Sequence, residues 1–417
     1  MAQLTDDCFA FNGKLLPLAE AEHLIAARYH CALASEPVPL GEALGRVLAT
    51  PLIAGVAVPP TDNSAVDGYA VHFDDLLPDR PTLLPLSGRE TAGHPSGAAL
   101  PRGTAARVFT GAVMPPGADT VLMQEDCSVA PEGVLLPAGI ARGANRRRAG
   151  EDVARGDLAL PEGHRLTPPD LALLGALGCA EVAVRCRLRA ALFSTGDEVA
   201  EPGNDLAPGR IFDANRFMLA ALLRRLGVDV SDGGILPDNV DRIRDALRDA
   251  AARHDVVITS GGVSTGDEDH VRTAIAAIGQ LQFWRVAIRP GRPVALGEAC
   301  GSPLIGLPGN PVAALVTFIT VARAVLDRLA GARRVALPRF PAVSAFAYRK
   351  KRGRREYPRV TLRADGTVLQ AHLFPKLGAG IITSLTHGDA LMELDEDNAG
   401  IAAGDVVPVL PLSVLYG

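Results

Sequence analysis

In DVVITSGGVSTGDEDHV, residues 255–271, the pattern of a buried strand is followed by a Gly-rich polar loop and then by the pattern of a helix. Glycines let backbone N–H groups approach an anion closely, and the N-terminus of the following helix favours negative charge. The three carboxylates of Asp267–Asp269 would repel an anion unless a cation lies between them. The loop therefore indicates a magnesium-bridged oxyanion site. The alternative is that these carboxylates only cap the helix.

The same strand–loop–helix unit repeats on both sides of this stretch. Apolar strand patterns alternate with helical patterns of period 3.6 from about residue 187 to residue 332. Such alternation predicts a doubly wound α/β domain, a parallel sheet covered by helices on both faces. The predicted strands are 188–193, 228–236, 255–260 and 302–307, and the predicted helices are 215–227, 239–254, 271–279 and 311–329.

Outside this region the patterns change. Helical spacing of apolar residues predicts helices over 18–29, 40–49 and 167–178, the last with Thr167 as N-cap and prolines in its first turn. Short β-type runs split by Pro and Gly predict a β-rich lobe, and hairpin signals predict a last β domain. We therefore expect four domains: a discontinuous helical linker domain (1–55 and 138–186), a β-rich lobe (56–137), the α/β domain (187–332) and a C-terminal β domain (333–417).

The composition is that of a folded protein with more than one core. The chain has 417 residues, 48% of them hydrophobic and 21% charged, with a formal net charge of -5. Six cysteines are scattered without a CxxC pair, which favours reduced thiols of a cytoplasmic protein. We expect no secretory signal and no membrane span, since the longest apolar helical run is short for a bilayer and carries Arg323.

In open α/β sheets, ligands bind at the carboxyl ends of the strands. The loops after the four predicted strands are polar, and three of them contain glycine, although each alone could be an ordinary turn. We expect them to supply Ser194, Thr195, Gly196 and Glu198; Asp238; Gly261, Gly262, Ser264 and Asp269; and Pro308, Gly309, Asn310 and Pro311.

Three further segments are candidates for the same site. Arg289 and Arg292 flank a Pro-Gly turn and could clamp a tetrahedral oxyanion, or lie on a surface hairpin. The polar loop PPTDNSAVDGYAV contains Asp62 and Ser64, and the stretch FTGAVMPPGADTV contains Thr110. The run RRRAGEDV carries Asp152 and could bind phosphate or form ion pairs within its domain.

Several motifs are absent. There is no GxxxxGK[ST] loop, no GxGxxG after a strand, no HExxH and no GxSxG, which excludes ordinary NTPases, dehydrogenases, zinc proteases and hydrolases. The basic run at 348–355 lacks interleaved aromatics, so we interpret it as a solvated hairpin and expect no nucleic-acid partner.

Six of these segments together resemble one family. PPTDNSAVDGYAV, FTGAVMPPGADTV, RRRAGEDV, STGDE, TSGGVSTGDEDHV and GLPGNPVAAL occur in the order found in the molybdopterin molybdenumtransferases, the molybdenum insertases similar to the E domain of gephyrin. The resemblance covers nearly the whole chain. It implies a cytoplasmic homodimer with four domains, the last a β barrel, and an active cleft between the α/β domain of one subunit and the β-rich lobe of the other.

The resemblance also implies a reaction. Such proteins take adenylylated molybdopterin and molybdate, insert molybdenum into the dithiolene and release AMP with Mg²⁺. By resemblance Glu198, Asp238 and Asp269 hold magnesium or orient phosphates, and Asp62 and Thr110 act from the other subunit. Ser64, Asp152, the Gly-rich loops and Ser264 bind the substrate, and molybdate lies near Arg289, Arg292 and the turn 308–311. Molybdopterin adenylyltransferase and molybdoenzyme clients are implied partners.

Two departures keep alternatives open. Relatives usually have lysines where this chain has Arg289 and Arg292, and many have Ser in place of Ala313. Only four of the 42 basic residues are lysines, so compositional drift is one explanation and a changed metalate preference another. The alternatives are a tungstate-preferring insertase, or a non-catalytic paralogue that carries the cofactor. A pure carrier has little need for Asp62, Asp238 and Asp269 together, and all three are present.

Overall fold

The computed structural model describes residues 15–262, 270–291 and 293–416. The chain folds into two compact units, one of Met1–Glu36, Gly45–Ala49 and Val184–Gly417, the other of Pro37–Leu44 and Thr50–Ala183. Each unit has hydrophobic cores of its own. None of the helices within the described ranges has the length and apolar character needed to cross a bilayer.

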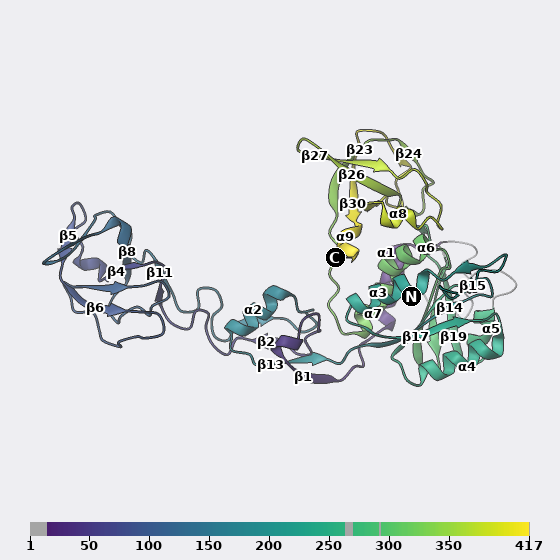
Figure 1. Cartoon of the computed structure of the whole chain (residues 1–417), viewed down its shortest axis with the longest axis horizontal. Coiled ribbons are helices and arrows are strands. Elements are labelled where there is room, and N and C mark those ends of the chain that lie inside the picture. Colours follow the sequence, from purple (N-terminus) through teal and green to yellow (C-terminus); the bar gives the residue numbers. More distant parts are fainter. Residues whose placement is uncertain (1–14, 263–269, 292, 417) are drawn as a thin grey trace. The chain divides into compact units, whose positions relative to one another are not determined.

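The smaller unit contains the β-rich lobe (Figure 1). One sheet has the order β6 (Leu86–Glu90), β7 (Ala105–Val108), β4 (Gly68–Val71), β8 (Thr120–Met123), and a second has the order β5 (Thr82–Leu84), β10 (Gly133–Leu136), β9 (Ser128–Ala130). A core containing Tyr69, Leu122 and Val134 joins residues of the two sheets. Short runs divided by Pro and Gly thus form two small sheets, as the pattern predicted.

The rest of this unit consists of short paired strands and one helix. The helix α2 (Pro168–Ala176) has Thr167 as N-cap and prolines in its first turn, which confirms the predicted start. The Asp170 carboxylate accepts a hydrogen bond from the Thr167 amide at 2.7 Å. The other elements are the pairs β3 (Asn63–Ser64) with β11 (Arg146–Arg147) and β2 (Leu52–Ile53) with β12 (Leu158–Leu160), and the 3₁₀ turns Leu40–Glu42, Phe73–Asp75 and Gln124–Asp126. The pair β1 (Ser35–Pro39) with β13 (Glu181–Arg185) has residues that belong to both units.

The predicted helix over residues 40–49 is wrong. Only the 3₁₀ turn Leu40–Glu42 forms there, and Gly45 adopts a φ of 73°, the left-handed backbone that ends helices. Leu48 instead forms a β-bridge with Val184. Because Val47, Leu48 and Ala49 are all buried, the apolar spacing reflects burial of an extended segment.

The larger unit is built on a six-stranded sheet of order β17-β14-β18-β22-β21-β19. The strands β17 (Asp229–Leu236), β14 (Arg189–Thr195), β18 (Val256–Ser260) and β22 (Ser302–Leu307) are parallel. The two edge strands β21 (Pro293–Ala299) and β19 (Gly279–Arg285) are antiparallel, an addition that the predicted parallel sheet did not include. The predicted α/β class is confirmed, with the order of a doubly wound sheet.

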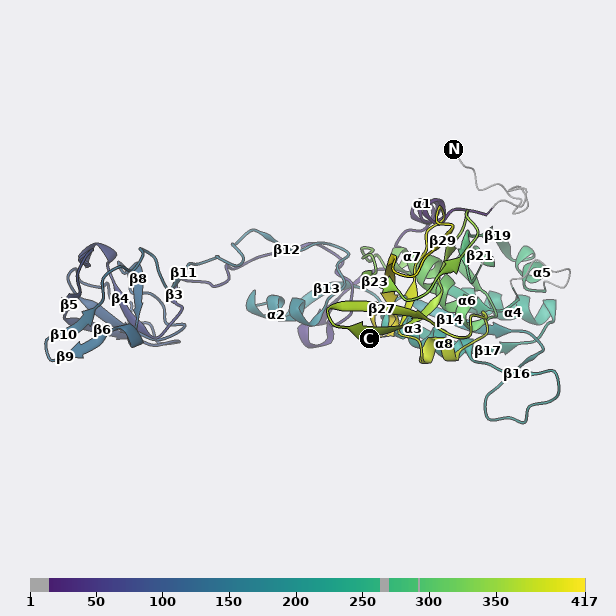
Figure 2. The ribbon, with the colours of Figure 1, turned by 90° about the horizontal axis from the view of Figure 1, so that it is seen from above.

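Helices cover both faces of this sheet. Successive residues of β14 point to opposite cores, Ala190 and Leu192 to one and Ala191 and Phe193 to the other. The first core holds residues of α1 (Leu18–Arg28), α3 (Asn215–Arg225) and the continuous run α6 (Pro311–Thr317), the π-helical segment Phe318–Ala322 and α7 (Arg323–Leu329). The second holds residues of α4 (Val240–Ala251) and α5 (His270–Ala276). Between β15 (Val199–Ala200) and β16 (Ile211–Phe212) the chain extends outward as a loop (Figure 2).

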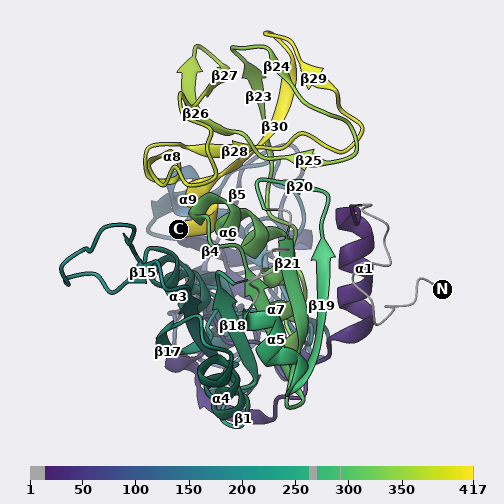
Figure 3. The ribbon, with the colours of Figure 1, turned by 90° about the vertical axis from the view of Figure 1, so that its right-hand side faces the viewer.

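A closed five-stranded barrel follows, as predicted from the β pattern and the resemblance. Its strand order is β23 (Phe340–Ser344), β27 (Val368–Leu373), β26 (Arg359–Asp365), β28 (Ala390–Met392), β30 (Val406–Pro411). The C-terminal domain that contains the barrel meets the α/β domain at a separate two-stranded sheet, where β25 (Arg355–Glu356) pairs in parallel with β20 (Ile288–Arg289) (Figure 3). The remaining elements are the pair β24 (Tyr348–Arg349) and β29 (Gly400–Ile401), and the short helices α8 (Thr383–Thr386) and α9 (Leu412–Tyr416).

Candidate active site

The loops after the parallel strands lie together at the carboxyl edge of the sheet. The Gly196 amide donates to the Leu236 carbonyl at 3.2 Å, and the Gly261 amide donates to the Leu307 carbonyl at 3.0 Å. These bonds join the loop after β14 to the end of β17, and the loop after β18 to the end of β22. The predicted candidates of four separate segments thus share one edge.

Gly261 and Gly262 allow two of these loops to pack backbone against backbone. Their φ values are 94° and 62°. A Cβ on Gly261 would come within 2.6 Å of the Thr195 carbonyl oxygen, and a Cβ on Gly262 would come within 2.7 Å of the Thr195 hydroxyl oxygen. The Thr195 Oγ1 atom is buried and has no hydrogen-bond partner among the described residues. A buried hydroxyl without a partner is a donor available to a ligand.

Asn215 is a site residue that the sequence interpretation missed. It begins α3 and is 6% exposed, and its Nδ2 donates to the Ser260 hydroxyl at 2.9 Å and the Gly309 carbonyl at 2.8 Å. One side chain thereby fixes the loop after β18 and the turn after β22. An Asn at a helix start resembles an ordinary cap, so its pattern gave no signal of this role.

Replacing Asn215 with Ala is expected to lower the free energy of unfolding by about 1–3 kcal/mol, because buried acceptors at Gly309 and Ser260 lose their donor. Asn215→Asp should cost more, since a carboxylate cannot donate to a carbonyl oxygen. Urea denaturation of the two variants and the wild type measures this. Equal stability of all three proteins would show that these bonds do not hold the loops.

Two of the predicted carboxylates at this edge, Glu198 and Asp238, belong to the described residues. Asp197 and Asp238 each accept a hydrogen bond from the other's amide at 3.1 Å, and the Glu198 carboxylate folds back against Gly196. Within the described ranges, no three His, Cys, Asp or Glu side chains lie close enough to hold a metal. Three predicted residues, Ser264, Asp269 and Arg292, lie outside the described residues.

In the β-rich lobe, Asp62 is held as a carboxylate. It forms an ion pair with Arg146 and accepts a hydrogen bond from the Ala149 amide at 2.7 Å. Partial burial alone would raise the pKa of Asp62, but the Ala149 amide and the Arg146 guanidinium together lower it below its ordinary value. Asp62 is therefore suited to position a charged group near neutral pH, and poorly suited to take up a proton.

Thr110 lies on a loop joined to the Asp62 loop. The Gly111 amide donates to the Ser64 carbonyl at 2.8 Å. The amide and hydroxyl of Thr110 donate to the Asp67 carboxylate at 2.8 and 2.9 Å, which fixes the orientation of its side chain. The Ser64 hydroxyl donates to its own turn, to the Val66 carbonyl at 2.6 Å, and the Asp152 side chain is exposed. Ser64 is fully buried, so its backbone is the part that shapes this loop.

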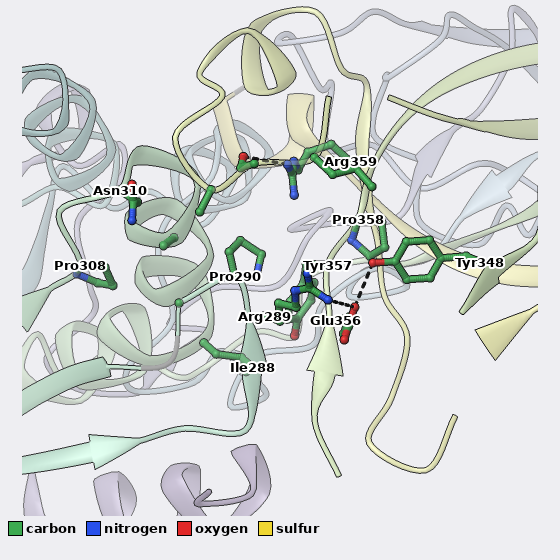
Figure 4. A pocket seen from close by; sticks show the side chains of 15 residues that line it. Ile288, Arg289, Pro290, Pro308, Asn310, Tyr348, Glu356, Tyr357, Pro358 and Arg359 are labelled. Atoms are coloured by element: carbon green, nitrogen blue, oxygen red, sulfur yellow. Dashed lines mark hydrogen bonds and ion pairs between the residues drawn. The ribbon is translucent and has the colours of Figure 1, made fainter. Parts of the chain in front are cut away.

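A cavity of about 360 Å³ lies where the barrel meets the α/β domain (Figure 4). The α/β side supplies Arg289, Pro308, Asn310 and Ala313, so the predicted arginine and the predicted turn line one space. From the barrel come the residues Tyr348, Glu356, Tyr357, Pro358, Arg359 and Leu377–Ala379.

Arg359 is the second residue that the sequence interpretation missed. The side chain lines the cavity although the residue is only 3% exposed. It donates to the Ser384 hydroxyl and the Gly378 carbonyl, both at 3.1 Å, and no carboxylate pairs with it in the described part of the chain. Burial lowers the pKa of Arg359 below the ordinary arginine value. A buried cation with only neutral partners favours an anion beside it.

Comparison with known proteins covers both units. Three protein-family profiles match: the MoeA N-terminal region (domain I and II) over residues 16–178, a probable molybdopterin binding domain over 191–328, and the MoeA C-terminal region (domain IV) over 341–412.

Individual relatives match over nearly their full length. The chain is 37% identical to the molybdopterin molybdenumtransferase of Haemophilus influenzae, over 92% of this chain and 95% of the relative. It is 35% identical to molybdopterin molybdenumtransferase 2 of Mycobacterium tuberculosis, over 90% and 95%. Among solved structures, the molybdopterin biosynthesis moeA protein of Pyrococcus horikoshii matches with a TM-score of 0.79 and 30% identity, over 95% of this chain and 99% of that one.

Proposed function

The chain belongs to the molybdopterin molybdenumtransferase family, and we propose that it inserts molybdenum from molybdate into adenylylated molybdopterin and releases AMP. The step belongs to molybdenum cofactor biosynthesis. The match of both units to full-length enzymes of this name supports it, and the predicted carboxylates Asp62, Glu198 and Asp238 are all present.

The observation that carries the proposal is the buried guanidinium of Arg359, which forms no ion pair with a carboxylate among the described residues. Molybdate is a tetrahedral dianion, and guanidinium groups donate paired hydrogen bonds to the oxygens of such ions. Arg289 and Arg359 line the same cavity, with the Pro308 and Asn310 turn on its other side. We assign molybdate to this cavity, which adds Arg359 to the predicted Arg289.

The substrate phosphates would lie at the neighbouring edge of the α/β sheet. The Thr195 hydroxyl and the Gly261–Gly262 backbone lie together at this edge, and the sequence predicts a further donor at Ser264. Asn215 bonds to Gly309 of the turn that lines the cavity, so one rigid segment connects the phosphate loops to the molybdate cavity. Cleavage of a phosphoanhydride needs mainly positioning and neutralisation of charge.

Magnesium fits this edge by the chemistry of its donors. It prefers carboxylate oxygens and usually takes only one or two of them together with substrate phosphates. Glu198 and Asp238 supply two, and Asp269 remains the predicted third. A bound Mg²⁺ would offset the negative charge of the phosphates.

We also propose a homodimer in which Asp62 and Thr110 of one copy act with the α/β loops of the other, as the resemblance implies. Mixing two inactive variants, Asp62→Asn and Asp238→Asn, tests this. Random pairing gives half heterodimers, each with one intact cleft, so about a quarter of the wild-type activity should return. A mixture after subunit exchange that stays as inactive as the separate variants would contradict shared clefts.

The reaction is tested by release of AMP from adenylylated molybdopterin with magnesium, in separate runs with molybdate, tungstate or neither. Molybdate-dependent release supports the insertase. Faster release with tungstate would favour a tungsten enzyme, since Arg289, Arg292 and Ala313 are the departures near the oxyanion. Tight nucleotide binding without release would favour a carrier. Molybdopterin adenylyltransferase and molybdoenzymes remain the proposed partners.

A further inference from the structure

The wall of the junction cavity contains a carboxylate that the reaction itself does not use. Glu356 is 1% exposed, its Oε1 accepts a hydrogen bond from Arg354 Nε at 2.7 Å, and its Oε2 accepts one from the Tyr348 hydroxyl at 2.9 Å. The Arg289 guanidinium lies 3.5 Å from the same Oε2 (Figure 4). Hydrogen bonds from Arg354 and Tyr348 therefore fix the Glu356 carboxylate, and Arg289 is a third, more distant partner.

The backbone fixes the two partners relative to each other. Arg289 and Glu356 are register partners in the parallel pair β20–β25, and the Tyr357 amide donates to the Arg289 carbonyl at 2.8 Å. The side chains differ in freedom, since that of Glu356 is 1% exposed and that of Arg289 is 55% exposed. The rigid carboxylate therefore restrains the mobile guanidinium, and Glu356 is the one carboxylate paired with Arg289 in the described part of the chain.

The charges around Glu356 decide whether it strengthens or weakens binding of the oxyanion. A carboxylate beside an oxyanion repels it, but Arg354 already offsets the charge of Glu356 at hydrogen-bond distance. What remains is the restraint on Arg289. Holding a flexible side chain in its binding position removes an ordering cost that the ligand would otherwise have to overcome.

We propose that Glu356 is a positioning residue for the oxyanion, which holds the Arg289 guanidinium at the cavity so that molybdate binds an arginine already in place. This inference rests on the proposed function. Tyr348 supports it by fixing the carboxylate oxygen nearest to Arg289.

The test compares Glu356→Gln with a matched control, Glu393→Gln. Both are buried barrel glutamates bonded to two arginines and one tyrosine, but Glu393 does not line this cavity. Glu356→Gln keeps the size and an acceptor for Tyr348. We expect it to raise the Kd and the KM for molybdate about threefold to tenfold, with kcat within twofold, because only an ordering cost is added. Glu393→Gln should leave both constants within twofold of the wild type.

A double variant tests whether Glu356 acts on molybdate binding through Arg289. Arg289→Ala should raise the KM, and adding Glu356→Gln to it should raise it no further, since the residue to be positioned is gone. A lower KM in Glu356→Gln, an unchanged KM, or full additivity in the double variant would each overturn the proposal. If Glu356→Gln does not fold, Glu356→Asp retracts the carboxylate from Arg289, and the same rise is expected.

Calorimetric titration with molybdate alone separates the two claims. A wild type that binds molybdate but releases no AMP would overturn the proposed reaction, while the Kd values of the variants would still decide the role of Glu356. A wild type that releases AMP while Glu356→Gln binds molybdate normally would overturn only the positioning role.

Discussion

Replacing Arg359 with Gln is expected to lower kcat/KM for molybdate about 100-fold, because hydrogen bonds to a charged partner contribute about 1.5–3 kcal/mol. Arg359 is the buried cation of the junction cavity, and its present partners, the Ser384 hydroxyl and the Gly378 carbonyl, are neutral. Steady-state AMP release at varied molybdate measures the loss, and binding of the adenylylated pterin should be unchanged.

The Arg359→Gln variant should lose activity without losing stability. Burial lowers the pKa of Arg359, so the empty protein gains little from its charge. Arg359→Gln should therefore melt at or above the wild-type temperature despite the lost activity, the pattern of a residue kept for function. Arg359→Lys, which keeps the charge without the fork, should fall between the two in activity. A near-normal kcat/KM of the Arg359→Gln variant would contradict the assignment of molybdate to this cavity.

Replacing Asp238 with Asn is expected to lower the rate of AMP release about 100-fold at fixed magnesium, because a charge that neutralises or orients the phosphates is lost. The fold should be unaffected. The Asp238 carboxylate accepts a bond from the Asp197 amide, and the Asn side-chain oxygen can accept the same bond. Rates measured over a range of magnesium concentrations check this, and added magnesium should recover part of the loss.

Asp197 provides the matched control for Asp238. It lies on the facing loop and makes the reciprocal bond, to the Asp238 amide at 3.1 Å, yet the family resemblance gives it no role. Asp197→Asn should keep its rate within about fivefold of the wild type, as expected of an exposed carboxylate outside the reaction. If both variants lost the same fraction of the rate of AMP release, the pair would act by shaping the loops, and the proposed role of Asp238 as a ligand would be contradicted.

Much of the fold could be predicted because hydrophobic periodicity and turn-forming residues are visible within short stretches of the sequence. The alternation of buried strands with helices fixed the class, and Thr167 with two prolines gave the start of α2. The helix over residues 40–49 failed because apolar spacing in a short segment also fits an extended chain that buries Val47, Leu48 and Ala49. The antiparallel edge strands β19 and β21 are neighbours in the sequence, and β21 joins β22 across the two-residue turn Cys300–Gly301. They were missed because this segment was interpreted from the Pro-Gly turn between Arg289 and Arg292, and no strand was assigned on either side of it.

The site could be predicted in part for the same reason. Strand-end loops mark candidate ligands by position, so Thr195, Asp238 and Asn310 could be predicted as site residues from the chain alone. Arg359 and Asn215 could not be, since one arginine in a barrel strand and one asparagine at a helix start look ordinary. What makes Arg359 informative is its burial with only neutral hydrogen-bond partners among the described residues, which depends on tertiary packing.

The most direct test of the molybdate assignment is diffraction from crystals soaked in molybdate, with data collected at the molybdenum absorption edge. We expect the strongest anomalous peak in the junction cavity, within hydrogen-bond reach of the Arg359 guanidinium and close to Arg289. A peak at the loop after β18, with none beside Arg359, would contradict the assignment.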